Sequence, residues 1–167
     1  MFDEFFGLPT HPFAIHAPLV LIPIAAVASL ILTVRSDARR RIGWFAPPGV
    51  FLLAAMVFVA KESGEALLDS ESAILFGTQQ QISDHQSLGE TTLLLAIAWF
   101  LLVLAVTVRD MLHSRAVAAR ALSSDVLRLG DDRVALLLQG LATVAAIATT
   151  VWLIRTGHAG AESRWGV

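Results

Sequence analysis

The sequence predicts an all-α integral membrane protein, a four-helix bundle with short interfacial helices in its loops. Of the 167 residues, 56% are hydrophobic and 16% are charged, whereas an ordinary soluble domain carries about 25% charged residues. The mean hydropathy of +0.69 agrees with this composition. The apolar residues gather in four blocks, at about 13–34, 44–60, 88–108 and 134–156, with polar segments between them. We therefore expect residues 1–167 to form a single four-span membrane domain.

The first span, 13–34, contains no charged residue, and at about 1.5 Å per residue it is long enough to cross a bilayer. Pro18 and Pro23 remove backbone donors, which predicts a kink in its first half. Small residues also recur at every fourth position, and such a stripe lets membrane helices approach closely. We expect this stripe to face a neighbouring helix; it comprises Ala25, Ser29 and Thr33.

The second span begins at an interfacial tryptophan, Trp44, and has Pro47-Pro48 in its first turn, where a missing donor costs little. After this span, the mixed composition of 65–75 predicts a short helix on the membrane surface. The polar segment 109–133 is rich in arginine and alanine. It predicts a second, amphipathic surface helix that ends at Gly130-Asp131-Asp132.

The third span opens with a serine and a glutamine three residues apart, Ser83 and Gln86, the spacing of a helix capping box. This spacing predicts that the third helix begins at Ser83. The fourth span carries several small or polar residues that suit packing between helices better than contact with lipid. These residues are Gln139, Gly140, Thr143, Thr149 and Thr150.

The distribution of basic residues predicts the orientation in the membrane. The loops after the first and third spans hold nine of the 12 lysines and arginines. The positive-inside rule places those loops in the cytoplasm and both termini on the outer side of the membrane. The nine are Arg35, Arg39, Arg40, Arg41, Arg109, Arg115, Arg120, Arg128 and Arg133, against Lys61, Arg155 and Arg164 on the other side.

Histidines on three different spans form the candidate functional site. With this orientation, all of the histidines except His113 lie on the outer side, and His16 lies inside the apolar part of its span. An ionisable side chain at that depth usually marks a functional site. Imidazoles from separate helices of a bundle are suitable ligands for haem iron or for a transition metal. We expect haem b or a transition-metal ion to be held by His16, His85 and His158.

Further outer residues are candidates to complete such a site or to orient a histidine. They are His11, Glu62, Glu65, Asp84 and Glu162. Of these, Glu162 lies four residues after His158 and shares its helical face. The chain has no cysteine, which excludes thiolate ligands and covalent c-type haem attachment by this chain.

This site predicts an electron-transfer or metal-handling subunit, and two alternatives stay open. Histidines at helix ends also bond free backbone carbonyls or lie among lipid headgroups, in which case the protein is a structural accessory subunit of a larger membrane complex. A small proton or solute carrier is the other alternative, but carriers typically show broken helices or repeated halves. Apart from the prolines of the first span, the sequence indicates neither.

Enzymatic activity is not indicated, because no hydrolase or transferase motif is present. The expected partners are the lipid bilayer, a redox partner or larger membrane complex, and a second copy of the chain. No feature of the sequence predicts binding to nucleic acid.

Three short motifs resemble the signatures of an uncharacterised family of small four-span bacterial inner-membrane proteins, the domain-of-unknown-function 2231 family. They are His11-Pro12-x-x-x-His16-x-Pro18, His85-x-x-Leu88-Gly89 and Thr156-Gly157-His158-x-Gly160. The chain departs from the family pattern after Gly160, where a second glycine is usual. The resemblance implies a four-helix bundle with histidines at its outer face and an association with redox or cytochrome-like modules. It implies no established activity.

Reporter fusions test the predicted orientation. Alkaline phosphatase is active only in the periplasm, so we expect a fusion at Val167 to be active and a fusion at Ser123 to be inactive. The measurement is phosphatase activity in whole cells, normalised to the amount of fusion protein. The reverse pattern would remove the four histidines from the outer side.

Overall fold

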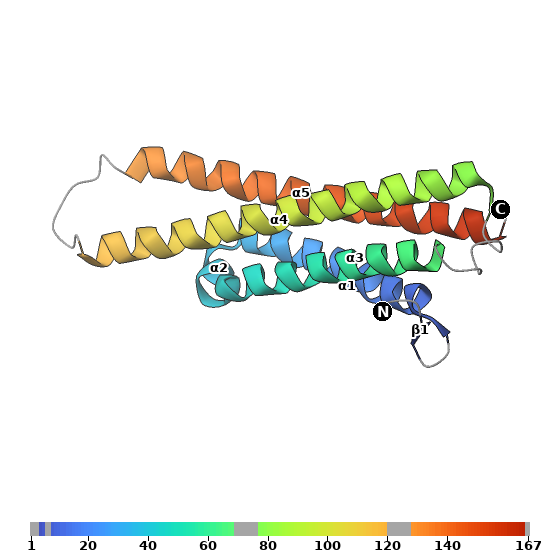
Figure 1. Cartoon of the computed structure of the whole chain (residues 1–167). Coiled ribbons are helices and arrows are strands. Elements are labelled where there is room, and N and C mark those ends of the chain that lie inside the picture. Colours follow the sequence, from blue (N-terminus) through green and yellow to red (C-terminus); the bar gives the residue numbers. More distant parts are fainter. Residues whose placement is uncertain (1–3, 6–7, 69–76, 120–127, 166–167) are drawn as a thin grey trace.

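The computed structural model describes residues 4–5, 8–68, 77–119 and 128–165, and it confirms the all-α four-helix bundle (Figure 1). Two antiparallel strands of two residues each, which were not predicted from the sequence, precede the first helix. The elements are β1 (Glu4–Phe5), β2 (Leu8–Pro9), α1 (Thr10–Val34), α2 (Ser36–Ile42), the 3-10 helix η1 (Gly43–Phe45), α3 (Ala46–Leu68), α4 (Gln79–Ala119) and α5 (Arg128–Trp165).

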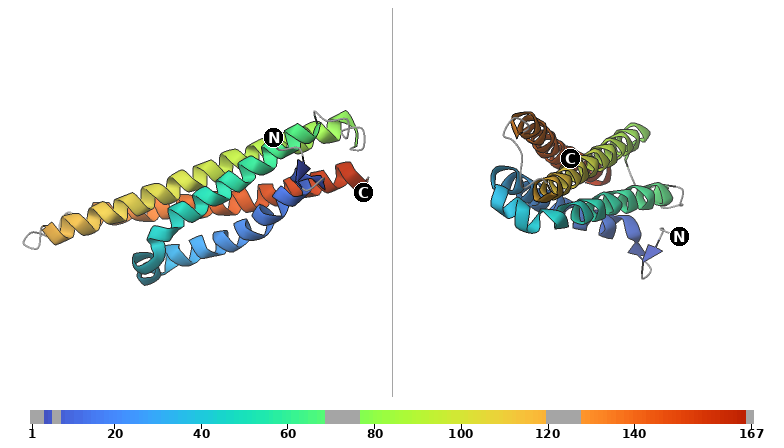
Figure 2. Two further views of the ribbon diagram at one scale, coloured as in Figure 1. Left: turned by 60° about the horizontal axis from the view of Figure 1, so that its bottom comes forward. Right: turned by 90° about the vertical axis from the view of Figure 1, so that its left-hand side faces the viewer.

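The four long helices run antiparallel to their neighbours. Helix α1 packs against α3 and α5, and α4 packs against the same two helices, so α1 and α4 lie at opposite corners of a square (Figure 2). We call the end where α1 and α4 begin the histidine end, and the end that carries α2 the arginine end. All four helices are long and apolar enough to cross a membrane, which makes the chain a multi-pass membrane protein.

The core of the bundle is apolar and so is its surface. Trp99 and Ile22 are fully buried at the centre of a cluster to which all four helices contribute. Large apolar side chains such as Leu94 and Leu136, each 67% exposed, cover the outside. A soluble protein rarely exposes so much continuous apolar surface, and this surface is suited to contact with lipid. Helix α1 continues through Pro18 and Pro23 as one helix, and the predicted kink there stays a prediction.

The third long helix begins earlier than predicted, and its cap is a different one. Ser83 and Gln86 lie within α4, whereas the capping box is formed by Thr78 and Gln81. The backbone N–H of Thr78 donates to Gln81 Oε1 (2.8 Å), and the backbone N–H of Gln81 donates to Thr78 Oγ1 (3.3 Å). The helix therefore gains more than a turn before the predicted start, and His85 lies well inside it.

The two segments predicted as surface helices are, as far as the structure describes them, parts of the long helices. The first four residues of 65–75 belong to α3, and the rest of that segment lies outside the described residues. Helix α4 continues to Ala119 without a break at Arg109. Gly130-Asp131-Asp132 lies inside α5 and does not interrupt it, so the predicted break there is wrong. Arginine and alanine are strong helix formers, so a helix started in the membrane continues through them.

The predicted stripe of small residues on α1 faces other helices. Ala25 packs against the buried core. Thr33 Oγ1 lies 3.0 Å from Thr143 Oγ1 of α5 and donates to the carbonyl of Ser29. On α5, Gln139 and Thr149 are buried as predicted, and Thr150 is half-buried. Gly140 is exposed, which contradicts the prediction for that residue.

Replacing Ala25 by leucine tests this packing. The added methylenes have to enter a filled interface, so we expect Ala25→Leu to lower the free energy of unfolding by about 1–3 kcal/mol. Ala28 lies one turn further along the same helix and is exposed, so Ala28→Leu is the matched control and should leave stability unchanged. Thermal or denaturant unfolding in detergent measures both. Equal stability of the two variants would contradict the packing of Ala25.

Candidate functional site

His11 lies in the first turn of α1 and is bound to α3. Its Nδ1 donates a hydrogen bond to the carbonyl oxygen of Ala60 (2.8 Å) and lies 3.3 Å from Ser63 Oγ. Ser63 is fully buried and its hydroxyl donates to the same carbonyl (2.9 Å). The imidazole ring lies directly over Gly64, since a Cβ atom built there would be 3.1 Å from Cε1 of the ring.

His85 makes two of the same contacts, to a backbone carbonyl and to a glycine, between α4 and α5. Its Nδ1 donates to the carbonyl oxygen of Thr156 (3.0 Å). Its ring lies over Gly160, where an added Cβ would be 2.9 Å from Cε1. The hydroxyl of Thr156 also meets that of Thr92 (2.9 Å), a second contact between α4 and α5 close to the histidine.

The two histidine rings lie close together in an edge-on arrangement. Their ring centroids are 6.1 Å apart and the ring planes are nearly perpendicular, at 82°. In both rings Nδ1 bonds a carbonyl oxygen, which can only accept, so Nδ1 carries the proton and Nε2 of the neutral ring presents a lone pair. No hydrogen bond joins either Nε2 to another residue in the described part of the chain. A backbone carbonyl on the far nitrogen is the usual support of a metal-binding histidine.

The matching contacts reveal that the bundle consists of two similar helical hairpins, α1–α3 and α4–α5. In each hairpin a histidine near the start of the first helix donates to a carbonyl of the second helix. Its ring then covers the glycine four residues after that carbonyl: Gly64 after Ala60, and Gly160 after Thr156. The two hairpins also cross the membrane in the same direction. They are therefore parallel repeats, of the kind related by an axis along the membrane normal.

The sequence and the burial pattern repeat in the same register. The sequence Thr-Val-Arg occurs at the same separation after each histidine, at 33–35 and at 107–109. Five pairs of buried positions coincide when the first helices are aligned on their histidines and the second helices on their glycines. The aligned buried pairs are Pro18 with Thr92, Ile22 with Ala96, Val50 with Ala146, Leu53 with Thr149, and Val57 with Leu153. His11 and His85 are thus equivalent residues of two repeats.

The other histidines of the predicted site lie elsewhere. His16 is exposed, and its Nδ1 bonds the carbonyl of Pro12 in its own helix. His158 is also exposed, and its Nε2 lies 3.3 Å from Glu162 Oε1, which confirms that these two share a face. The predicted grouping of His16, His85 and His158 is therefore not formed, and His85 is joined by His11 instead. His113 lies toward the arginine end of α4, far along the helix from this pair.

The outer carboxylates do not contact the histidine pair. Glu65 and Glu62 are both paired with Lys61, at 2.6 and 3.4 Å. Asp84 accepts a hydrogen bond from Gln80. The described residues contain no group of three or more histidine, cysteine, aspartate or glutamate side chains placed to hold a metal ion. Any ion at the pair would thus have two protein ligands among them, with open positions for water or another ligand.

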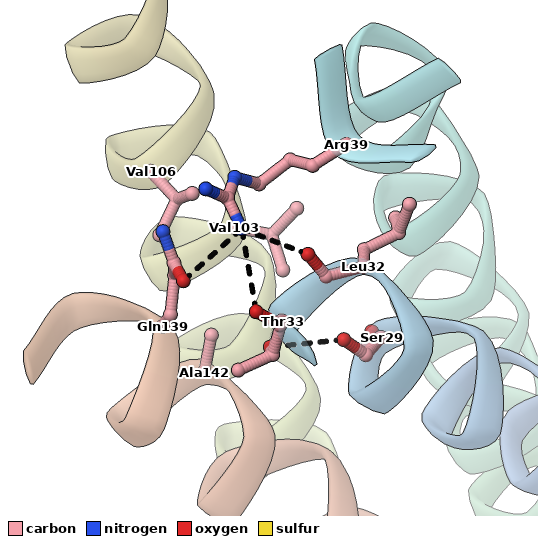
Figure 3. A pocket seen from close by; sticks show the side chains of 8 residues that line it. All are labelled: Ser29, Leu32, Thr33, Arg39, Val103, Val106, Gln139 and Ala142. Carbon is pink, nitrogen blue, oxygen red and sulfur yellow. Dashed lines mark hydrogen bonds between the residues drawn. The ribbon is translucent and has the colours of Figure 1, made fainter. Parts of the chain in front are cut away.

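A second polar site, at the arginine end, involves an arginine that the sequence analysis treated only as a topology signal. Arg39 Nε donates to Asp110 Oδ2 of α4 (3.0 Å), and one terminal nitrogen donates to the carbonyl of Leu32 (2.9 Å) and to Gln139 Oε1 of α5 (3.2 Å). Figure 3 shows the guanidinium pointing into the cavity, of about 40 Å³, between these helices. This volume has room for a few water molecules. The network joins the end of α1 to α4 and α5.

The fold and the histidine pair define a class: a multi-pass membrane protein built from two helical hairpins, with a two-imidazole site where the hairpins meet. Comparison with known protein families, with curated proteins and with solved structures gave no significant match.

Alanine in place of the two glycines tests the histidine contacts. A methyl group at Gly160 would lie 2.9 Å from the ring of His85, so the ring has to shift away from the Thr156 carbonyl. We expect Gly160→Ala, and Gly64→Ala at 3.1 Å from His11, to lower stability by about 1–3 kcal/mol.

The control is Gly140→Ala, since a Cβ there meets nothing within 4 Å. Alanine favours a helix over glycine by up to about 1 kcal/mol, so this variant should be as stable as the wild type or more stable. Unfolding in detergent measures all three variants. A gain in stability for Gly160→Ala equal to that of Gly140→Ala would show that the His85 ring is not held as described.

Proposed function

We propose that this protein is a bacterial inner-membrane, metal-handling subunit that binds a transition-metal ion between His11 and His85 at the periplasmic end of the bundle. The observation that carries the proposal is the pair of neighbouring imidazoles, whose ring centroids are 6.1 Å apart. The Nδ1 atom of each ring is bonded to a backbone carbonyl. Neutral imidazole held in this way is a good ligand for zinc, copper, iron or nickel.

The distance between the rings is suited to one shared ion. A metal–nitrogen bond is about 2 Å, and a ring nitrogen lies about 1.2 Å from its ring centroid, so two imidazoles on opposite sides of one ion have centroids roughly 6.4 Å apart. The observed separation of 6.1 Å is close to this value. The centroid separation therefore leaves room for one ion between the two rings.

A bare ion fits this site better than haem b does. Haem also accepts two axial histidines at a similar separation, but its macrocycle needs a wide slot between them. Binding of haem would require the hairpins to move apart by the width of the macrocycle, whereas an ion needs only the space between the two rings.

The repeated hairpins favour metal handling over electron transfer. Repeated halves are typical of carriers, whose binding site lies between the halves near the bilayer midplane. Here the histidines also lie between the two hairpins, but at one end of the bundle. A small metal-ion carrier is therefore the second candidate function. The periplasmic location of the histidine end rests on the excess of arginine at the opposite end.

Asparagine substitutions separate metal binding from a purely structural role of the two histidines. The asparagine side-chain N–H₂ can take the place of Nδ1–H and donate to the same carbonyl, but asparagine has no equivalent of Nε2. We expect His11→Asn and His85→Asn to stay folded and to weaken binding of Zn²⁺, Ni²⁺ or Cu²⁺ by more than the 10–100-fold typical of groups that only support a ligand. Calorimetric titration of the full chain in detergent measures the affinity.

The matched controls are His16→Asn and His158→Asn, which change exposed histidines near the same end. These variants should bind the metals as the wild type does, and His113→Asn should do the same. Two outcomes would contradict the proposal. One is a wild-type chain that takes up none of the three ions; the other is a loss of binding that is equal in His16→Asn and His11→Asn.

A further inference from the structure

The arginine end of the bundle carries an open groove between the end of α1 and α2. It has a volume of about 660 Å³, and its lining combines two arginines with apolar residues. The lining residues are Val34, Arg35, Ser36, Asp37, Ala38, Arg41 and Ile42.

The charge of this groove is positive. Arg35 and Arg41 are exposed, and in the described part of the chain neither makes an ion pair. Asp37 is the acidic residue of the lining, and it is paired with Arg40 next to it. Arg39 is also satisfied, because it points away into the bundle and binds Asp110. Two guanidinium groups with free donors therefore remain at the groove, a combination that binds phosphate strongly.

The apolar part of the groove continues onto the outer surface of the bundle. Val34, 70% exposed, and Ile42, 53% exposed, line the groove. Val34 ends α1, whose exposed Ile31 and Val27 lead toward the centre of the bilayer. On the other side, the exposed Trp44 follows in η1, and tryptophan prefers the level of the lipid headgroups.

We propose that this groove binds an anionic phospholipid, with the phosphate between Arg35 and Arg41 and an acyl chain along the exposed face of α1. A free phosphate or a nucleotide would use the two arginines but would have no use for the apolar residues that lead away from them. A lipid matches both parts of the groove. Basic pockets beside membrane helices are known binding sites for anionic headgroups.

Lipid titration of the full chain in detergent tests the proposal, with bound lipid counted by native mass spectrometry. The probes are phosphatidylglycerol, phosphatidylcholine and inorganic phosphate. We expect the wild type to bind phosphatidylglycerol in preference to phosphatidylcholine. The double variant Arg35→Gln, Arg41→Gln should weaken phosphatidylglycerol binding by roughly 10- to 30-fold, as expected for two basic groups at a membrane surface.

The control is Arg115→Gln, Arg133→Gln, which removes the same charge from exposed positions at the same end but outside the groove. This control should bind as the wild type does. Asp37→Asn should strengthen binding, because it removes the negative charge from the lining and releases Arg40.

Three results would overturn the proposal. An equal loss in both double variants would show that only the general surface charge matters. Equal binding of phosphatidylglycerol and phosphatidylcholine would show that the headgroup charge is not recognised. Displacement of the lipid by inorganic phosphate at millimolar concentration would show a site for free phosphate.

Discussion

The absence of water from the bilayer interior is the constraint on which this structure depends. Lipid offers no hydrogen-bond partner, so polar groups inside the bundle bond within the protein; among the described side chains, the buried Nε1 of Trp99 is the exception. Buried hydroxyls meet this need by donating to the carbonyl one turn earlier, as Thr92 does to Leu88 and Thr149 to Ala145. His11 and His85 instead donate to a carbonyl of the neighbouring helix. Their bonds therefore fix how the two helices of each hairpin lie against each other.

The fold could be predicted because hydropathy along the chain is sufficient to locate four spans, and a membrane allows few other arrangements. The ends of the helices could not be predicted in the same way. Outside the membrane no hydrophobic signal marks where a helix stops, and residues around Arg109 and Gln80 favour a helix as well as those inside do. The start of α4 was misplaced because Ser83 and Thr78 both fit a capping box, and sequence spacing does not distinguish them. The structure selects Thr78, whose bonds with Gln81 are reciprocal.

A histidine site at this end of the bundle was predicted, but not the pair of histidines that forms it. His11 and His16 are five residues apart and so point about 140° away from each other around the helix, which means that both cannot face the interior. Depth in the membrane favoured His16, whereas the structure turns His11 inward. The signal that could have decided the question is the equal separation of His11 and His85 from Thr-Val-Arg, at 33–35 and 107–109. That pattern identifies these two histidines as equivalent, and the glycines Gly64 and Gly160 indicate where their rings pack.

The two ends of the bundle differ in how the hairpins are joined, and this difference bears on the function. At the arginine end, Arg39 of the first hairpin binds Asp110 and Gln139 of the second, and Thr33 meets Thr143. At the histidine end, the hydrogen bonds of His11 and His85 lie within each hairpin, and the two imidazole rings approach each other across the hairpins. An ion bound by both Nε2 atoms would add a bond between the hairpins at the end of the bundle that the Arg39 network does not reach.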